Sequence, residues 1–114
     1  MSLQSVLAEL TPLPGVRGAL IVSREDGLVV ADALREDVDG PAVAALAARL
    51  ADRMASVTQA LGQPEPVTWQ LQASEGMLLA APAREGLLVV AVADLGVNAG
   101  ELRLRVLRAA AQAA

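Results

Sequence analysis

The chain has 114 residues and a formal net charge of −4, and it contains no His, Cys, Lys, Tyr or Phe. These absences remove the side chains that usually act as general bases or soft metal ligands near neutral pH, leaving carboxylates that suit only hard cations. An acidic chain without a basic stripe or aromatic stacking platforms is also a poor binder of nucleic acids, so we expect a non-enzymatic protein that binds through its surface, with no cofactor and no metal.

The length fits a single domain over residues 1–114, because domains cluster around about 100–150 residues. The absence of cysteine fits a reducing compartment, and no charged segment followed by a long apolar run opens the chain. The longest apolar run, residues 87–93, is far shorter than the ~20 residues of a membrane helix. We therefore expect a cytoplasmic protein with no membrane insertion.

The first third of the chain predicts a helix followed by a β-hairpin. Apolar residues recur at helical spacing over residues 3–10, with Ser2 as the N-cap, and the prolines and glycine of residues 11–15 end this helix. Residues 19–22 predict a buried strand and residues 28–31 the returning strand, because the Asp26-Gly27 dipeptide between them favours a hairpin turn.

The longest predicted helix covers residues 41–61, with Asp39 near its start and Gly62 at its end. One stripe is expected to face the core: Val43, Ala47, Leu50, Met54, Val57 and Leu61. The opposite face carries Ala45, Ala48, Arg49, Asp52, Ala55, Ser56 and Gln59. Its alanines have two explanations that the sequence leaves open, namely helix propensity and the close approach of another helix.

The last part of the chain predicts a three-stranded meander and a helix. Residues 67–73 alternate strictly between apolar and polar, and short turns connect them to strands at residues 77–81 and 87–93. Asn98 caps the final helix, and Glu101 completes a capping box.

Strand character predicts the order of the strands in the sheet. Residues 19–22 and 87–93 are apolar on both faces and should be central, whereas the half-polar residues 67–73 belong at an edge. The fold class is therefore α/β with helix and strand order α-β-β-α-β-β-β-α. It forms one five-stranded antiparallel sheet, order 2-1-5-4-3, with helices on both faces.

Residues 67–73 form an edge with little protection. Pro64 and Pro66 precede the strand, but no charge or proline follows in the strand itself, and bare strand edges recruit other strands. The strand also holds Trp69, the only aromatic residue. One interpretation is that Trp69 packs inward and water satisfies the edge. The other is that two copies pair these strands antiparallel about a two-fold axis, which would also bring the long helices together.

An ordered set of motifs resembles the Roadblock (dynein light chain) family, and within it the bacterial MglB-like members. The set begins with Leu10-x-x-Leu13-Pro14-Gly15-Val16-x-Gly18-Ala19 and Val22-Ser23-x-x-Asp26-Gly27-Leu28-Val29. It continues with the alanine-rich helix, the strand at residues 86–93 and Asn98-x-Gly100-x-Leu102-Arg103.

The resemblance implies a profilin- or longin-like fold and a non-catalytic homodimer that regulates or scaffolds a small Ras-like GTPase. By analogy, the dimer interface would consist of Leu50, Met54, Val67, Thr68, Trp69, Gln70 and Leu71. The GTPase would dock on Ala45, Ala48, Arg49, Asp52 and Ser56. Functions that depend on an extension after the last helix are not expected, because the sequence ends soon after it.

Other interpretations stay open at this stage. The chain is alternatively a structural subunit that pairs with a related Roadblock chain, and a small-molecule sensor is disfavoured by the scarcity of aromatic residues. Arg49 and Arg53 are candidate arginine fingers, although Arg49 is more simply a surface charge paired with Asp52. The acidic pairs at residues 25–26 and 36–39 are explained by turn chemistry and by the start of a helix.

Overall fold

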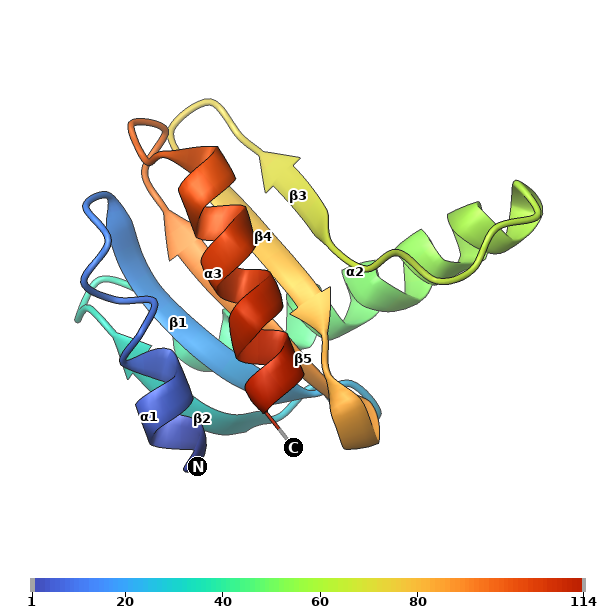
Figure 1. Cartoon of the computed structure of the whole chain (residues 1–114), viewed down its shortest axis with the longest axis horizontal. Helices are drawn as coiled ribbons and strands as arrows, with labels where there is room; N and C mark the ends of the chain where they lie inside the picture. Colours follow the sequence, from blue (N-terminus) through green and yellow to red (C-terminus); the bar gives the residue numbers. More distant parts are fainter. Residues whose placement is uncertain (1, 114) are drawn as a thin grey trace.

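A computed structural model describes residues 2–113 of the chain. The elements are, in chain order, α1 (Leu3–Leu7), β1 (Val16–Ser23), β2 (Val29–Leu34), α2 (Gly40–Ala60), β3 (Trp69–Gln72), β4 (Met77–Pro82), the short 3-10 helix η1 (Arg84–Gly86), β5 (Leu87–Ala93) and α3 (Ala99–Gln112). Figure 1 shows them in sequence colours.

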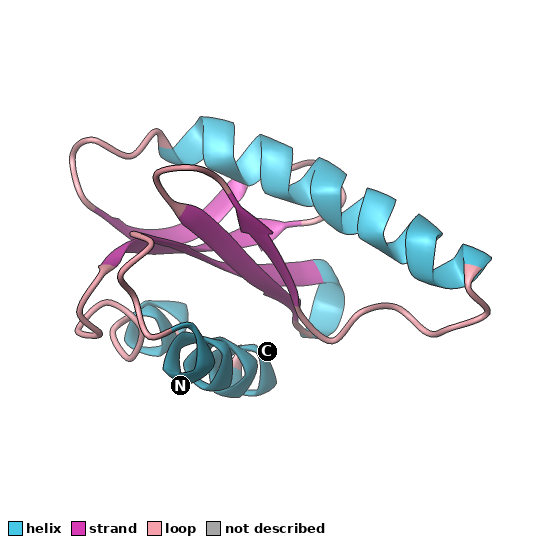
Figure 2. Cartoon of the chain, turned by 90° about the horizontal axis from the view of Figure 1, so that it is seen from above, coloured by secondary structure: helices cyan, strands magenta, loops and turns pink. Residues whose placement is uncertain are grey.

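The strands form one antiparallel sheet in the order β2-β1-β5-β4-β3. Helix α2 covers one face of this sheet, and α1 and α3 cover the other (Figure 2). The strand order and the central positions of β1 and β5 confirm the prediction from strand character. These two strands are apolar on both faces because each face lies under a helical layer.

Two apolar clusters hold the layers together. The larger one joins α1 and α3 to the sheet and includes Leu7, Leu79, Leu102 and Val106. The smaller one lies under α2, where the helix contributes almost only alanine to the buried surface: Ala44, Ala47, Ala48 and Ala51. Small side chains bring α2 close to the sheet, so this layer is packed without large helix residues.

The expected core stripe of α2 is therefore partly wrong. Ala47 is buried, Val43, Leu50 and Met54 are half-buried at the side of the cluster, and Val57 and Leu61 are exposed. Ala48, expected on the outer face, is buried. The reason is that alanines, not the larger residues, make the closest contact with the sheet, so the buried stripe is rotated around the helix from the stripe of large residues.

The three predicted N-caps are confirmed, while the C-cap of α2 is Leu61 instead of Gly62 and several element bounds differ. Backbone amides of Ser5, Ala42 and Glu101 donate to the side chains of Ser2, Asp39 and Asn98 at 3.2, 3.1 and 3.0 Å. Helix α1 ends at Leu7 instead of residue 10, β1 is longer at both ends, and β2 runs to Leu34. The side chain of Glu101 bonds to Arg105 at 2.9 Å instead of closing the capping box.

Strand β3 is shorter than the predicted strand at residues 67–73, and it lies at the predicted edge. Trp69 packs inward: its side chain is 7% exposed and contacts the cluster under α2. This outcome matches the interpretation in which the indole belongs to the core. The ring is therefore not available as an exposed contact for a partner.

Candidate functional site

The β2 edge of the sheet is closed to further strands. A register shift between Ile21 and Val22 leaves Val30 as an extra residue, which makes a β-bulge. The side-chain amide of Gln4, on α1, donates to the outward-facing carbonyl of Asp32 at 2.9 Å. A bulge, a charged residue and a covering side chain are the usual means of protecting an edge.

The β3 edge has no such protection. The amide of Ala73 donates to the carbonyl of Gly76 at 2.8 Å. The backbone N–H and C=O groups of the odd-numbered residues 69, 71 and 73 therefore point toward β4. Because hydrogen-bonding groups alternate along a strand, the N–H and C=O groups of Gln70 and Gln72 point away from the sheet. No strand lies beyond β3 in the described part of the chain.

An apolar flank of α2 continues this edge. Leu50 and Met54 pack half-buried against the cluster that contains Trp69, and Val57 and Leu61 follow on the same flank with exposed side chains. These last two side chains are exposed because the C-terminal end of α2 extends past the edge of the sheet, and the loop after it returns to β3 (Figures 1 and 2). We call this surface the pairing face, and it comprises Leu50, Met54, Val57, Leu61, Val67, Leu71 and the outward groups of β3.

A second surface lies on the side of α2 that faces solvent. The turn between β1 and β2 packs against the helix, and Gly27 adopts a φ of 71° that brings the turn to the Cα atom of Ala45. A hollow of about 280 Å³ lies beside this contact and is lined in part by Ala45, Arg49 and Asp52. We call this surface the docking face, which comprises Leu28, Ala45, Arg49, Asp52 and Ser56.

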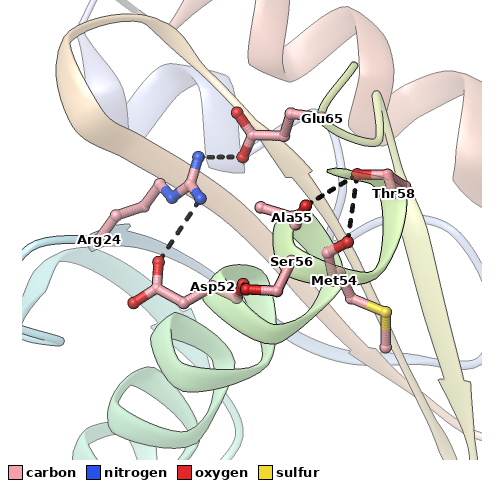
Figure 3. A network of polar contacts seen from close by, with 7 residues as sticks. All are labelled: Arg24, Asp52, Met54, Ala55, Ser56, Thr58 and Glu65. Carbon is pink, nitrogen blue, oxygen red and sulfur yellow. Dashed lines mark hydrogen bonds and ion pairs between the residues drawn. The ribbon is translucent and has the colours of Figure 1, made fainter. Parts of the chain in front are cut away.

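Arg24 connects the two surfaces (Figure 3). Its guanidinium is 3.7 Å from the carboxylate of Asp52 on α2 and also pairs with Glu65 in the loop before β3. The expected pair between Arg49 and Asp52 is not formed, because Asp52 turns to Arg24. Within residues 2–113, Arg49 and Arg53 have no ion pair.

The structure brings most of the predicted site residues together. Leu50, Met54 and Leu71 lie on the pairing face, and the hydroxyl of Thr68 donates to the carbonyl of Ala80 at 3.0 Å, which fixes the start of β3. Among the residues expected to dock a partner, only Ala48 is misplaced: it is buried beneath the turn at Gly27, so its side chain offers no free surface.

Sequence patterns missed four residues of these surfaces. Val57 and Leu61 continue an apolar stripe and were therefore predicted for the core, and Leu28 was predicted only as the start of the returning strand. The role of Arg24 carries no sequence signal, since its partners lie 28 and 41 positions away.

The acidic pairs serve local structure. The side chain of Asp26 accepts a hydrogen bond from the amide of Leu28 at 3.3 Å, and Asp39 caps α2. Within residues 2–113, no group of three or more carboxylates is close enough to hold a metal ion. No helix in the same range is long and apolar enough to span a bilayer.

These features define a class: a profilin-like α/β fold that presents an open strand edge and two helix surfaces. The solved structure of profilin II from Acanthamoeba castellanii has this fold, with a TM-score of 0.68, 16% identity, and 96% of this chain and 94% of that chain covered. A model of the Roadblock/LC7 domain matches residues 3–93. The chain belongs to the Roadblock/LC7 family.

Solved structures of two MglB proteins are similar in fold. MglB of Myxococcus xanthus gives a TM-score of 0.84 at 19% identity, over 95% of this chain and 88% of that one. MglB of Thermus thermophilus gives a TM-score of 0.81 at 26% identity, over 93% and 81%. These neighbours confirm the MglB-like branch of the resemblance.

A curated relative is archaeal. The uncharacterized protein MJ0714 of Methanocaldococcus jannaschii is 34% identical over 105 residues, which cover 92% of this chain and 87% of that protein. The expectation that the chain is bacterial therefore stays a prediction.

Proposed function

We propose that two copies of the chain associate through the pairing face into a homodimer, and that the dimer regulates or scaffolds a small Ras-like GTPase without catalytic chemistry of its own. The observation that carries the first part is the contrast between the two sheet edges. One edge is closed by a bulge and by Gln4, whereas the other exposes backbone groups beside an apolar flank. Family membership and the similarity to MglB structures support the second part.

The geometry of β3 restricts how two copies would pair. Antiparallel pairing uses only residues whose backbone groups point outward, here Gln70 and Gln72. A two-fold axis at Gln70 or at Leu71 meets this condition, whereas an axis between them would oppose outward and inward groups. Either axis continues the sheet from one subunit to the other and places both α2 helices on the same face.

Pairing would bury the exposed part of the apolar flank. Because α2 extends past its own sheet, Val57 and Leu61 would lie over the partner subunit (Figure 2). Burial of a large aliphatic side chain contributes about 1.5–3 kcal/mol, so these residues would account for much of the affinity. Both docking faces would then lie side by side and form one platform.

The platform is suited to a protein partner. It combines the exposed Leu28 with Arg49 and Arg53, which make no ion pair within residues 2–113. A regulator that repositions loops of a GTPase needs no general base, since the GTPase itself holds the nucleotide and Mg²⁺. Either arginine could additionally supply charge to the partner's active site.

The test is binding of purified Ras-like GTPases from the source genome, each loaded with GDP or with a non-hydrolysable GTP analogue. We expect the wild-type protein to bind one of them and Leu28→Glu to weaken that binding at least tenfold. Leu104→Glu is the matched control, because Leu104 on α3 is 58% exposed and Leu28 is 63% exposed. Equal binding by both variants would remove the docking face from the proposal.

The alternative partner is a related Roadblock chain. Light scattering after size-exclusion chromatography separates the two cases, because a homodimer has twice the 11.7 kDa mass of the chain. A purified protein that stays at 11.7 kDa would favour a heteromeric structural subunit.

A further inference from the structure

The part of the pairing face that extends beyond the sheet is weakly attached to the body of the protein. No residue of α2 after Ala51 is fully buried. The amides of Gly62 and Gln63 donate only to carbonyls of α2 itself, those of Gln59 and Thr58. Backbone hydrogen bonds therefore do not hold the end of α2, or the loop that follows, to the sheet.

Arg24 makes that attachment. It follows β1 directly, and its amide donates to the carbonyl of Gly86 at 2.9 Å, which fixes its backbone beside β5. Its side chain is only 20% exposed and reaches both Asp52 and Glu65 (Figure 3). A planar guanidinium has donors on several sides and can hold two carboxylates at once, which an ammonium on a flexible stem does less well.

We infer that Arg24 is a positioning residue for dimerisation: it sets the angle of the projecting end of α2 and the path of the loop into β3. This inference rests on the proposed homodimer. Asp52 lies in the half of α2 that leads to Val57 and Leu61, and Glu65 lies two residues before Val67, so the two ion pairs tie the helix and the loop on either side of the projecting end to β1. Arg24 acts on these residues through Asp52 and Glu65.

The two ion pairs of Arg24 would raise the affinity of the dimer by holding the pairing face in place before the two copies meet. Without the two ion pairs, the packing of Met54 and the bond from Thr68 to β4 still hold the two ends, but the segment between them is held less firmly. Pairing must then order that segment at the moment of association. Surface ion pairs are individually weak, about 0.2–1 kcal/mol. A dimer contains this network twice, so removing it from both subunits should raise the dissociation constant about tenfold.

The experiment measures the dimer dissociation constant of Arg24→Ala by sedimentation, together with amide exchange in the unligated protein. We expect about a tenfold higher dissociation constant and faster exchange confined to residues 62–70. The matched control is Arg105→Ala. Arg105 is also partly buried and bonds to Glu101 at 2.9 Å and to the carbonyl of Glu9 at 3.2 Å, but it lies in the layer of α1 and α3. It should leave the dissociation constant unchanged.

Glu65→Gln tests the same network at the more exposed of the two paired residues. This variant also replaces Arg24→Ala as the test if Arg24→Ala fails to fold. Glu65→Gln should raise the dimer dissociation constant by part of the amount seen with Arg24→Ala. When Glu65→Gln is combined with Arg24→Lys, the rise in the dissociation constant should be smaller than the two single variants together would give. Additive effects, or an unchanged dissociation constant in Glu65→Gln, would overturn the inference. A monomeric wild-type protein would overturn the proposed homodimer itself, whereas a wild-type dimer that tolerates Arg24→Ala would overturn only the role of Arg24.

Discussion

At the scale of single residues, the alanines of α2 decide how this protein is packed. Ala44, Ala47 and Ala51 are fully or almost fully buried against Leu20, Val22, Leu88 and Val90 of the sheet. A helix that approaches this closely needs no aromatic residues to fill the space beneath it, which fits a chain with a single aromatic side chain. The larger apolar residues of α2 do not fill this layer, and they form the pairing face instead.

Overpacking this layer should therefore destabilise the protein. Ala47→Leu adds three carbon atoms where the helix meets the sheet, and we expect a loss of about 1–3 kcal/mol in the free energy of unfolding. Urea denaturation followed by circular dichroism measures it. Ala42→Leu is the control, because Ala42 is an exposed residue of the same helix, and its stability should stay within about 0.5 kcal/mol. Equal losses in both variants would mean that the close approach of α2 is not the reason for its alanines.

At the scale of elements, β3 differs from β2 although both are edge strands. Four residues are paired in β3, and its edge carries neither a charge nor a bulge. Within one subunit, β3 contributes mainly through the buried side chain of Trp69, and the outward backbone groups of Gln70 and Gln72 add nothing to that packing. Its unprotected backbone therefore has a clearer explanation in association than in folding.

A charge on this edge should separate association from folding. Leu71→Asp places a carboxylate on the pairing face, and we expect the dimer dissociation constant to rise at least 100-fold, about 3 kcal/mol. Val30→Asp is the matched control: Val30 is 47% exposed on β2 and Leu71 is 46% exposed on β3. Light scattering over a dilution series compares them. A dimer that survives Leu71→Asp, or that is lost equally in Val30→Asp, would contradict pairing through β3.

The sequence predicts the elements well where local chemistry decides them. Ser2, Asp39 and Asn98 begin helices as their side chains indicate, and the bounds of β5 coincide with its apolar run. The orientation of α2 could not be predicted in the same way. Periodicity locates an apolar stripe but does not distinguish a stripe that meets the sheet from one that extends past it, so Val57 and Leu61 were placed in the core.

At the scale of the whole molecule, the strand order follows from which strands are apolar on both faces, and this rule was sufficient here. The candidate site depends on contacts between distant segments. Arg24, Asp52 and Glu65 belong to a strand end, a helix and a loop, and no local pattern links them. The pairing face and the docking face both use α2, so the same helix would join one subunit to the other and present the dimer to its partner.

Amide exchange at β3 tests the central claim most directly. The amides of Gln70 and Gln72 point away from the sheet, whereas the amide of Leu71 points toward β4 and serves as an internal reference. Residue-resolved exchange over a dilution series should show Gln70 and Gln72 protected in the dimer and unprotected in the monomer, with Leu71 protected in both. If Gln70 and Gln72 exchange freely while the protein sediments as a dimer, the two copies associate through another surface.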